Sequence, residues 1–288
     1  MTGLNNFIPE IWSANILVTL ENSLVFANLA NREHEGEIKA YGDTVHITGI
    51  GDIQIQDYTK YGKLTIQPVT DIDAGVLKID QSKAFAFEVD DLDTVQARDD
   101  LRGKFQERAA YNLAAEVDKY VGGLMVTAAA SKALKKTYTK PEDVYESIVS
   151  LGVRLSKQNI PTTGRFLVVD PDVYGMLLLD DRFVKNTAVE SATLHNGFVG
   201  NVDGFTVYQT NCMPGNTDTK HTMLAGSTIA TTFAQQISKM ESTRREESFS
   251  DLIKGLLVYG AKVIRPEALA TCELTTTGSV SRLSLIHI

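Results

Sequence analysis

One short run of the chain begins like a zinc-binding motif. His34 and Glu35 match the first two positions of HExxH, in which two histidines one helical turn apart bind zinc beside a catalytic glutamate. Ile38 occupies the position of the second histidine, so two imidazoles cannot share one helix face. We therefore expect no zinc site here.

Two pairs of carboxylates have a spacing that metal ions or acid–base catalysis could use. Asp71 and Asp73 fall in a strand-rich loop, whereas Asp170 and Asp172 flank Pro171 in the pattern of a helix N-cap. Local structure accounts for both pairs. We expect neither pair to be catalytic or to bind a metal.

Motifs for nucleotide binding and nucleophilic catalysis are incomplete. The Gly-Ile-Gly run at 49–51 resembles the start of a dinucleotide fingerprint, but Gln54 replaces its third glycine, and no GxxxxGK[ST] loop occurs in the sequence. Ser227 lacks the flanking glycines of a nucleophile elbow, and Cys212 has no recognisable partner. We expect a chain that is not an enzyme and needs no cofactor; a hydrolase whose site leaves no motif is the alternative.

Composition limits the partners. The 288 residues are 43% hydrophobic and 22% charged, which is ordinary for a globular protein. No stretch approaches the roughly 20 apolar residues of a membrane span, and the two cysteines fit neither a disulfide framework nor a zinc spacing. Because phosphate binding depends on Lys and Arg, the net charge of -8 predicts only weak direct binding to DNA. We expect no membrane contact.

The first 40 residues read as an arm that needs a surface to lie on. Its apolar face includes Phe7, Ile11 and Trp12. That surface belongs either to a neighbouring subunit or to the arm's own domain, and the sequence leaves both possibilities open.

From residue 41 to residue 89, apolar and polar residues alternate between glycines, which predicts a series of short strands. Residues 49–68 predict a two-stranded ribbon, one face of which carries Ile53, Ile55, Leu64 and Ile66. Because a ribbon of this size is marginal by itself, we expect a partner to cover this face.

A long helix is predicted after the strands. Apolar residues recur at three- and four-residue steps from Leu92 to Leu124, and Asp90, Asp91 and Asp93 favour the helix N-terminus. The pair at 122–123, both glycines, predicts an end or a bend.

The second half predicts a mixed α/β lobe. A capping box at 139–142 opens a helix that stops at 159–161, a buried strand starts at Phe166, and Asp170 caps the next helix. A turn at 203–204 precedes a strand at 205–208, and a further strand spans 221–225. We then expect a Thr- and Ala-rich helix over 227–236 and a strand over 252–264 that pairs with strands encoded much earlier.

The segments GRFLVVDPDVYGMLLLDDRF, GFVGNVDGFTVYQTNCMP and the stretch from HTMLAGS to IRPEAL carry a likeness to a known family. They resemble coat proteins of the Salmonella podovirus-like family, within the major capsid proteins of tailed double-stranded DNA bacteriophages. The resemblance implies the Hong Kong type capsid fold, of α+β class. It assigns residues 1–40 to an N-terminal arm, 41–89 to the E-loop and flanking strands, 90–138 to the spine helix of a peripheral domain, 139–247 to an axial domain, 248–275 to a return strand and 276–288 to a C-terminal tail.

The resemblance also implies partners. Copies of the chain would form hexamers and pentamers of an icosahedral head around DNA, with a portal and, in some relatives, a decoration protein. The chain opens directly on the arm, without the helical segment that serves some members as a built-in scaffold, which implies a separate scaffolding protein. Assembly would take place in the host cytoplasm, and the product would be the virion capsid.

The residues expected to contact neighbouring subunits are those of the arm named above and those of the E-loop, namely Ile53, Ile55, Tyr58, Lys60, Tyr61, Lys63, Leu64 and Ile66. A shell protein of a cellular nanocompartment with the same fold is the alternative, because residues alone do not separate the two.

Overall fold

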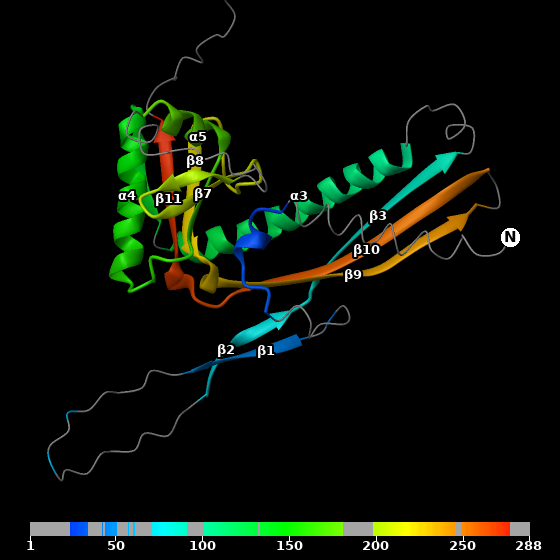
Figure 1. The fold of residues 1–288 in the computed structure, drawn as a ribbon, viewed down its shortest axis with the longest axis horizontal. Coiled ribbons are helices and arrows are strands. Elements are labelled where there is room, and N and C mark those ends of the chain that lie inside the picture. Colours follow the sequence, from blue (N-terminus) through cyan, green and yellow to red (C-terminus); the bar gives the residue numbers. More distant parts are fainter. Residues whose placement is uncertain are drawn as a thin grey trace, which may run out of the picture.

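In the computed structural model a long helix joins a three-stranded and a six-stranded β-sheet, and a two-stranded hairpin forms a third sheet (Figure 1). The structure describes residues 24–33, 42, 44–50, 57, 60, 71–90, 101–131, 133–180, 198–245 and 249–276. Strands from distant parts of the sequence pair in the two larger sheets, and helices pack against them. The expected α+β class is therefore confirmed. Within these ranges no helix has the length and apolar character needed to cross a membrane.

The first sheet has three long antiparallel strands in the order β3 (Gln81–Asp90), β10 (Ser250–Val263) and β9 (Thr231–Arg244). The predicted pairing of the late strand with one encoded much earlier is confirmed by β3. The predicted helix over 227–236 is wrong: a single turn, η3 (Thr228–Ala230), leads directly into β9. The β-branched threonines of this segment are compatible with either state, and pairing with β10 decides for the strand.

The two faces of this sheet have different covers. On one face lies helix α3 (Leu101–Ala130), where Tyr120 meets Tyr259 edge-on at 5.5 Å between ring centroids. On the other face lies the hairpin of β1 (Thr44–Ile50) and β2 (Asp71–Lys78). Its contact with the sheet is a small separate core of Ile47, Leu77, Ile79, Ala234 and Val258. The predicted strands in 41–89 are thus confirmed, while residues 51–56, 58–59 and 61–70 lie outside the described part.

Gly260 lies where the chain passes from the β1–β2 hairpin into the three-stranded sheet. A Cβ at this position would collide with the backbone carbonyl of Lys78, the last residue of β2, and would meet Ile79 Cδ1 at 3.0 Å. Tyr259 pairs with Gln81, the first residue of β3. The absence of a side chain at Gly260 therefore allows the chain to cross β10 at close range.

Helix α3 continues through Gly122 and Gly123 to Ala130, so of the two predicted alternatives at this pair, an end or a bend, the end is wrong. Gly122 has a packing role instead: a Cβ there would stand 2.8 Å from Cε2 of Phe26, whose ring lies against the helix. Asp90 is the last residue of β3 and not part of the helix start, and residues 91–100 lie outside the described part.

The second sheet has six strands, and helices lie on both of its faces (Figure 1). Thr271 donates to the carbonyl of Ala129 in α3, whereas its neighbour Cys272 contacts Ser147 on the opposite side. Because successive side chains of a strand point to opposite faces, the end of α3 covers one face and α4 (Pro141–Lys157) the other. Helix α5 (Pro171–Leu178) packs against α4. The strand order is β4 (Leu134–Tyr138), β11 (Leu269–Thr276), β8 (Lys220–Ser227), β5 (Arg165–Val169), β7 (Phe205–Gln209) and β6 (Phe198–Val202).

Most local predictions for this lobe are confirmed. The β6–β7 turn has positive φ at Asp203 (48°) and Gly204 (78°), as a tight hairpin turn requires. The box that opens α4 is shifted by one residue from the prediction, because Lys140 is the N-cap. The carboxylate of Asp143, and not that of Glu142, accepts hydrogen bonds from the backbone N–H groups of Thr139 (2.9 Å) and Lys140 (3.0 Å).

Candidate functional site

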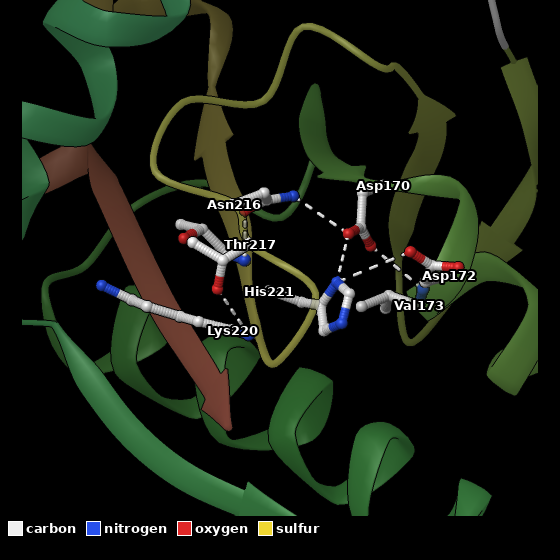
Figure 2. Close-up of polar contacts among 8 residues, drawn as sticks. Asp170, Asp172, Val173, Asn216, Thr217, Lys220 and His221 are labelled. Carbon is white, nitrogen blue, oxygen red and sulfur yellow. Dashed lines mark hydrogen bonds and ion pairs between the residues drawn. The ribbon is translucent and has the colours of Figure 1, made fainter. Parts of the chain in front are cut away.

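Three segments of the six-stranded lobe meet at a buried carboxylate (Figure 2). One oxygen of Asp170 accepts the N–H of Val173 at 3.0 Å, which confirms the predicted helix cap. Its second oxygen lies 2.9 Å from Nδ2 of Asn216 and 2.5 Å from Nδ1 of His221. Asn216 in turn accepts the N–H of Thr222 at 2.8 Å. The start of α5, the loop before β8 and β8 itself are thereby tied together.

Asp170, Asp172 and His221 also have the composition of a small metal site, with donor atoms within 4.8 Å of one another. The Asp170 carboxylate already has three protein partners: the N–H of Val173, Nδ2 of Asn216 and Nδ1 of His221. Oδ2 of Asp172 is 4.0 Å from Nδ1 of His221, and the Asp172 side chain is 81% exposed. The group therefore matches a structural hydrogen-bond network rather than a coordination shell.

The network affects one further side chain. The ring of Tyr138 lies edge-on to that of His221, with 6.1 Å between centroids. Burial, followed by the negative charges of Asp170 and Asp172, raises the pKa of Tyr138, so its hydroxyl stays protonated at neutral pH. Asp170 and His221 are only 5% and 4% exposed, so their paired polar atoms are used within the fold.

We expect Asp170→Asn to lower the free energy of unfolding by about 2 kcal/mol, because an amide in place of an oxygen leaves a buried donor without an acceptor. Asp172→Asn is the matched control, and at this exposed position a change within about 0.5 kcal/mol is expected. Urea denaturation of both variants measures the difference. Equal losses, or stabilisation of the unmodified chain alone by added Zn²⁺, would instead indicate a metal site.

A hollow of about 370 Å³ lies on the three-stranded sheet. Cross-strand partners share a face, so Ala84 with Leu256, and Ala86 with Lys254, lie on the face opposite α3. Leu256 also packs against the core beneath the β1–β2 hairpin, so the hollow continues the surface that this hairpin covers. The lining residues are Ala84, Phe85, Ala86, Glu241, Lys254, Gly255 and Leu256. An apolar floor with one carboxylate and one amine suits an extended apolar segment.

Most of the predicted contact residues lie outside the described part. Lys60 is described and exposed. The pairing of Ile50 with Asp71 means that residues 51–70 leave and return at the same end of the β1–β2 hairpin. The residues outside the described part are Phe7, Ile11 and Trp12 of the arm and Ile53, Ile55, Tyr58, Tyr61, Lys63, Leu64 and Ile66 of the ribbon.

Comparison with known proteins gives a consistent result. Residues 75–272 match the model of a protein family described as phage capsid protein. A solved chain of Mycobacterium phage Che8 is 30% identical, with a TM-score of 0.68, over 86% of this chain and 90% of that one. The capsid structure of Cyanophage P-SCSP1u is 18% identical, with a TM-score of 0.67, over 90% and 89% of the two chains.

A virus-like particle from Pyrococcus furiosus is 11% identical, with a TM-score of 0.58, over 91% of this chain and 98% of that one. The likenesses to the cyanophage capsid, at 18% identity, and to this particle, at 11%, concern the fold alone. No curated protein sequence matches the chain.

Proposed function

Because the chain belongs to the phage capsid protein family, its role is structural, and we propose that its copies assemble as hexamers and pentamers into an icosahedral head around double-stranded DNA. The family match over residues 75–272 is the observation that carries this proposal. The solved structures confirm the expected capsid fold. The chain is therefore a component of the virion capsid and not an enzyme. Its particular likeness to Salmonella podovirus-like coat proteins stays a prediction.

The proposed domains follow the same fold. In the predicted division, residues 90–138 and 248–275 belong to a peripheral domain and 139–247 to an axial domain. Because β4 and β11 lie in the six-stranded sheet, we place these two strands with the axial domain. The strand β9, at 231–244, belongs to the three-stranded sheet, so we move the end of the axial domain to the η3 turn. The arm at 1–40 and the E-loop within 41–89 would make contacts between subunits.

We further propose that the E-loop of one subunit lies in the hollow on the three-stranded sheet of its neighbour. Two observations support this. The E-loop predicts an apolar face that a two-stranded ribbon cannot bury alone. The hollow offers an apolar floor on the same face of the sheet that already receives the base of the hairpin.

Further partners are proposed from the same resemblance. They are a separate scaffolding protein, a portal at one vertex and, in some relatives, a decoration protein, with assembly in the host cytoplasm. The net charge of -8 supports weak direct contact with the enclosed DNA.

Negative-stain electron microscopy of the full chain, expressed alone and with the scaffolding protein of its virus, tests the proposal. We expect closed shells in at least one of the two preparations. A chain that stays monomeric in both would contradict it. Shells that enclose a folded enzyme would instead support the nanocompartment, whose likeness at 11% identity concerns the fold alone.

A further inference from the structure

Residues 24–33 form a strap that connects helix α3 to the edge of the three-stranded sheet (Figure 1). Its apolar side chains are buried from Leu24 to Ala30, and it contains the short turn η1 (Ala27–Leu29). At its far end, Asn31 donates to the carbonyl of Thr231 (2.8 Å) and accepts from the N–H of Phe233 (2.9 Å). The strap is thus held at both ends by different elements.

The carboxylate of Asp118 on α3 holds the near end. It accepts hydrogen bonds from the backbone N–H groups of Val25 at 2.7 Å and Ala27 at 3.3 Å. The residue is only 3% exposed. Beside it, the ring of Phe26 lies against Gly122, one helical turn further along α3. The hydrogen bonds to Asp118 and the packing of Phe26 on Gly122 therefore hold the strap at one place on α3, which we call its seat.

This carboxylate is buried without a counter-charge among the described residues. In the strap, Leu24 to Ala30 contain no titratable side chain. Its charged residues lie at the far end, where the guanidinium of Arg32 lies over the Phe233 ring and Glu33 accepts from the side chain of Asn31. From the loop before β8, the titratable group that faces Asp118 is the thiol of Cys212, whose pKa is raised by burial and then by the Asp118 charge. On α3 itself, Glu116 and Lys119 pair with each other at 3.1 Å and are exposed.

We propose that the strap is a proton-controlled latch, seated most firmly on α3 when Asp118 carries a proton and loosened when this carboxyl ionises. The latch would respond to the pH around the unassembled or assembled subunit. Because the strap, at 24–33, lies inside the predicted arm of residues 1–40, its seating would control how firmly the arm is tied to its own subunit. The inference concerns one chain, so it can fail or hold independently of shell formation.

The direction of the effect follows from the desolvated carboxylate. Burial raises the pKa of Asp118 to about 6, although the strap's N–H donors pull it in the opposite direction. An Asp exposed by an unseated strap has the ordinary value of 3.8. The raised pKa means that the seated form binds the proton more tightly. Seating is therefore strongest below about pH 4, weakens as the pH rises to about 6, and is constant above it.

Hydrogen exchange of the full-length chain at low concentration, followed by mass spectrometry of peptides that contain 24–33, tests the latch. After correction for the intrinsic exchange rate, the opening equilibrium of the strap should increase about tenfold per pH unit between pH 4 and 6. It should then level off, for a total change of about 100-fold. A strap whose opening does not change over this range would overturn the proposal.

Four variants assign the effect. Asp118→Asn, neutral at every pH, should abolish the slope, and a retained slope would also refute the latch. Cys212→Ser removes the facing thiol and should leave the slope intact, so loss of the slope in this variant would assign the effect to Cys212 instead.

The other two variants keep the proposal testable if Asp118→Asn does not fold. Gly122→Ala collides with Phe26, and its strap should open more at every pH with the same slope. Gly123→Ala meets no atom within 4 Å and should behave as the unmodified chain. A strap that opens no more in Gly122→Ala than in the unmodified chain would show that this place on α3 does not hold the strap, and would overturn the proposal.

Discussion

Closed shells should fail to form when residues 51–64 are replaced by a short Gly/Ser linker, while the subunit should keep its fold. The base of the hairpin stays in place, because Ile47, Leu77 and Val258 belong to a core below the replaced segment. What is lost is the apolar face proposed to lie on a neighbour. Sedimentation velocity with scaffolding protein present should show no shells, and the circular dichroism melting curve should stay near that of the unmodified chain.

Two further variants test the same contact from the side of the hollow. Ala86→Arg introduces a charge into the hollow at an exposed position, so it should also prevent assembly without unfolding the subunit. Ala86→Ser, which adds no charge at the same position, is the matched control and should assemble normally. A linker variant that still forms closed shells, or one that is unfolded, contradicts the E-loop assignment.

Gly260→Ala should lower the free energy of unfolding by about 3 kcal/mol, the upper part of the usual cost of overpacking. The new methyl group would collide with the carbonyl of Lys78, and a backbone atom cannot rotate away. Because this is the point where β2 crosses β10, the collision should also separate the hairpin core from the sheet. Chemical denaturation measures the loss.

Gly255→Ala, five residues earlier in the same strand, is the matched control. There the new methyl group would meet the far end of the Phe85 side chain, which is only partly buried and can shift more easily than a backbone carbonyl. We expect a loss of about 1 kcal/mol or less. Equal losses in the two variants would show that the crossing at Gly260 has no special role.

Sequence signals that act within a few residues predicted the structure well. Asp170 before Pro171 gave the cap of α5, and the Asp203-Gly204 pair gave the β6–β7 turn, because these residues favour such conformations wherever they occur. The alternation in 41–89 likewise predicted the strands β1, β2 and β3.

Predictions failed where distant segments decide the local state. The segment 227–236 became β9 because β10 offers a complete set of backbone partners. The glycine at 122 did not end the helix because the ring of Phe26 fills the space beside it. Neither partner can be recognised from the segment itself, so the error follows from tertiary contacts and not from weak patterns.

The same distinction applies to the candidate sites. The cap at Asp170 was predictable, but its contacts with Asn216 and His221 were not, since 46 and 51 residues separate them. The Asp118 seat gave no motif, because its partners are backbone N–H groups that any sequence provides. The contact residues of the arm and ribbon stay predictions, because their proposed partners belong to another copy of the chain.

The positions of β10 and β11 bear on how the chain is made. Each lies inside its sheet, β10 between β3 and β9 and β11 between β4 and β8, yet both are encoded after residue 249. A nascent chain still on the ribosome can therefore complete neither sheet until these strands have been translated, and β3 must wait for a partner encoded far downstream. The hollow on the three-stranded sheet requires β10, so it cannot exist before then. If the E-loop docks in this hollow as proposed, this contact between subunits has to wait until β10 is made, whereas fragments released before β10 would expose unpaired strands and be prone to aggregate.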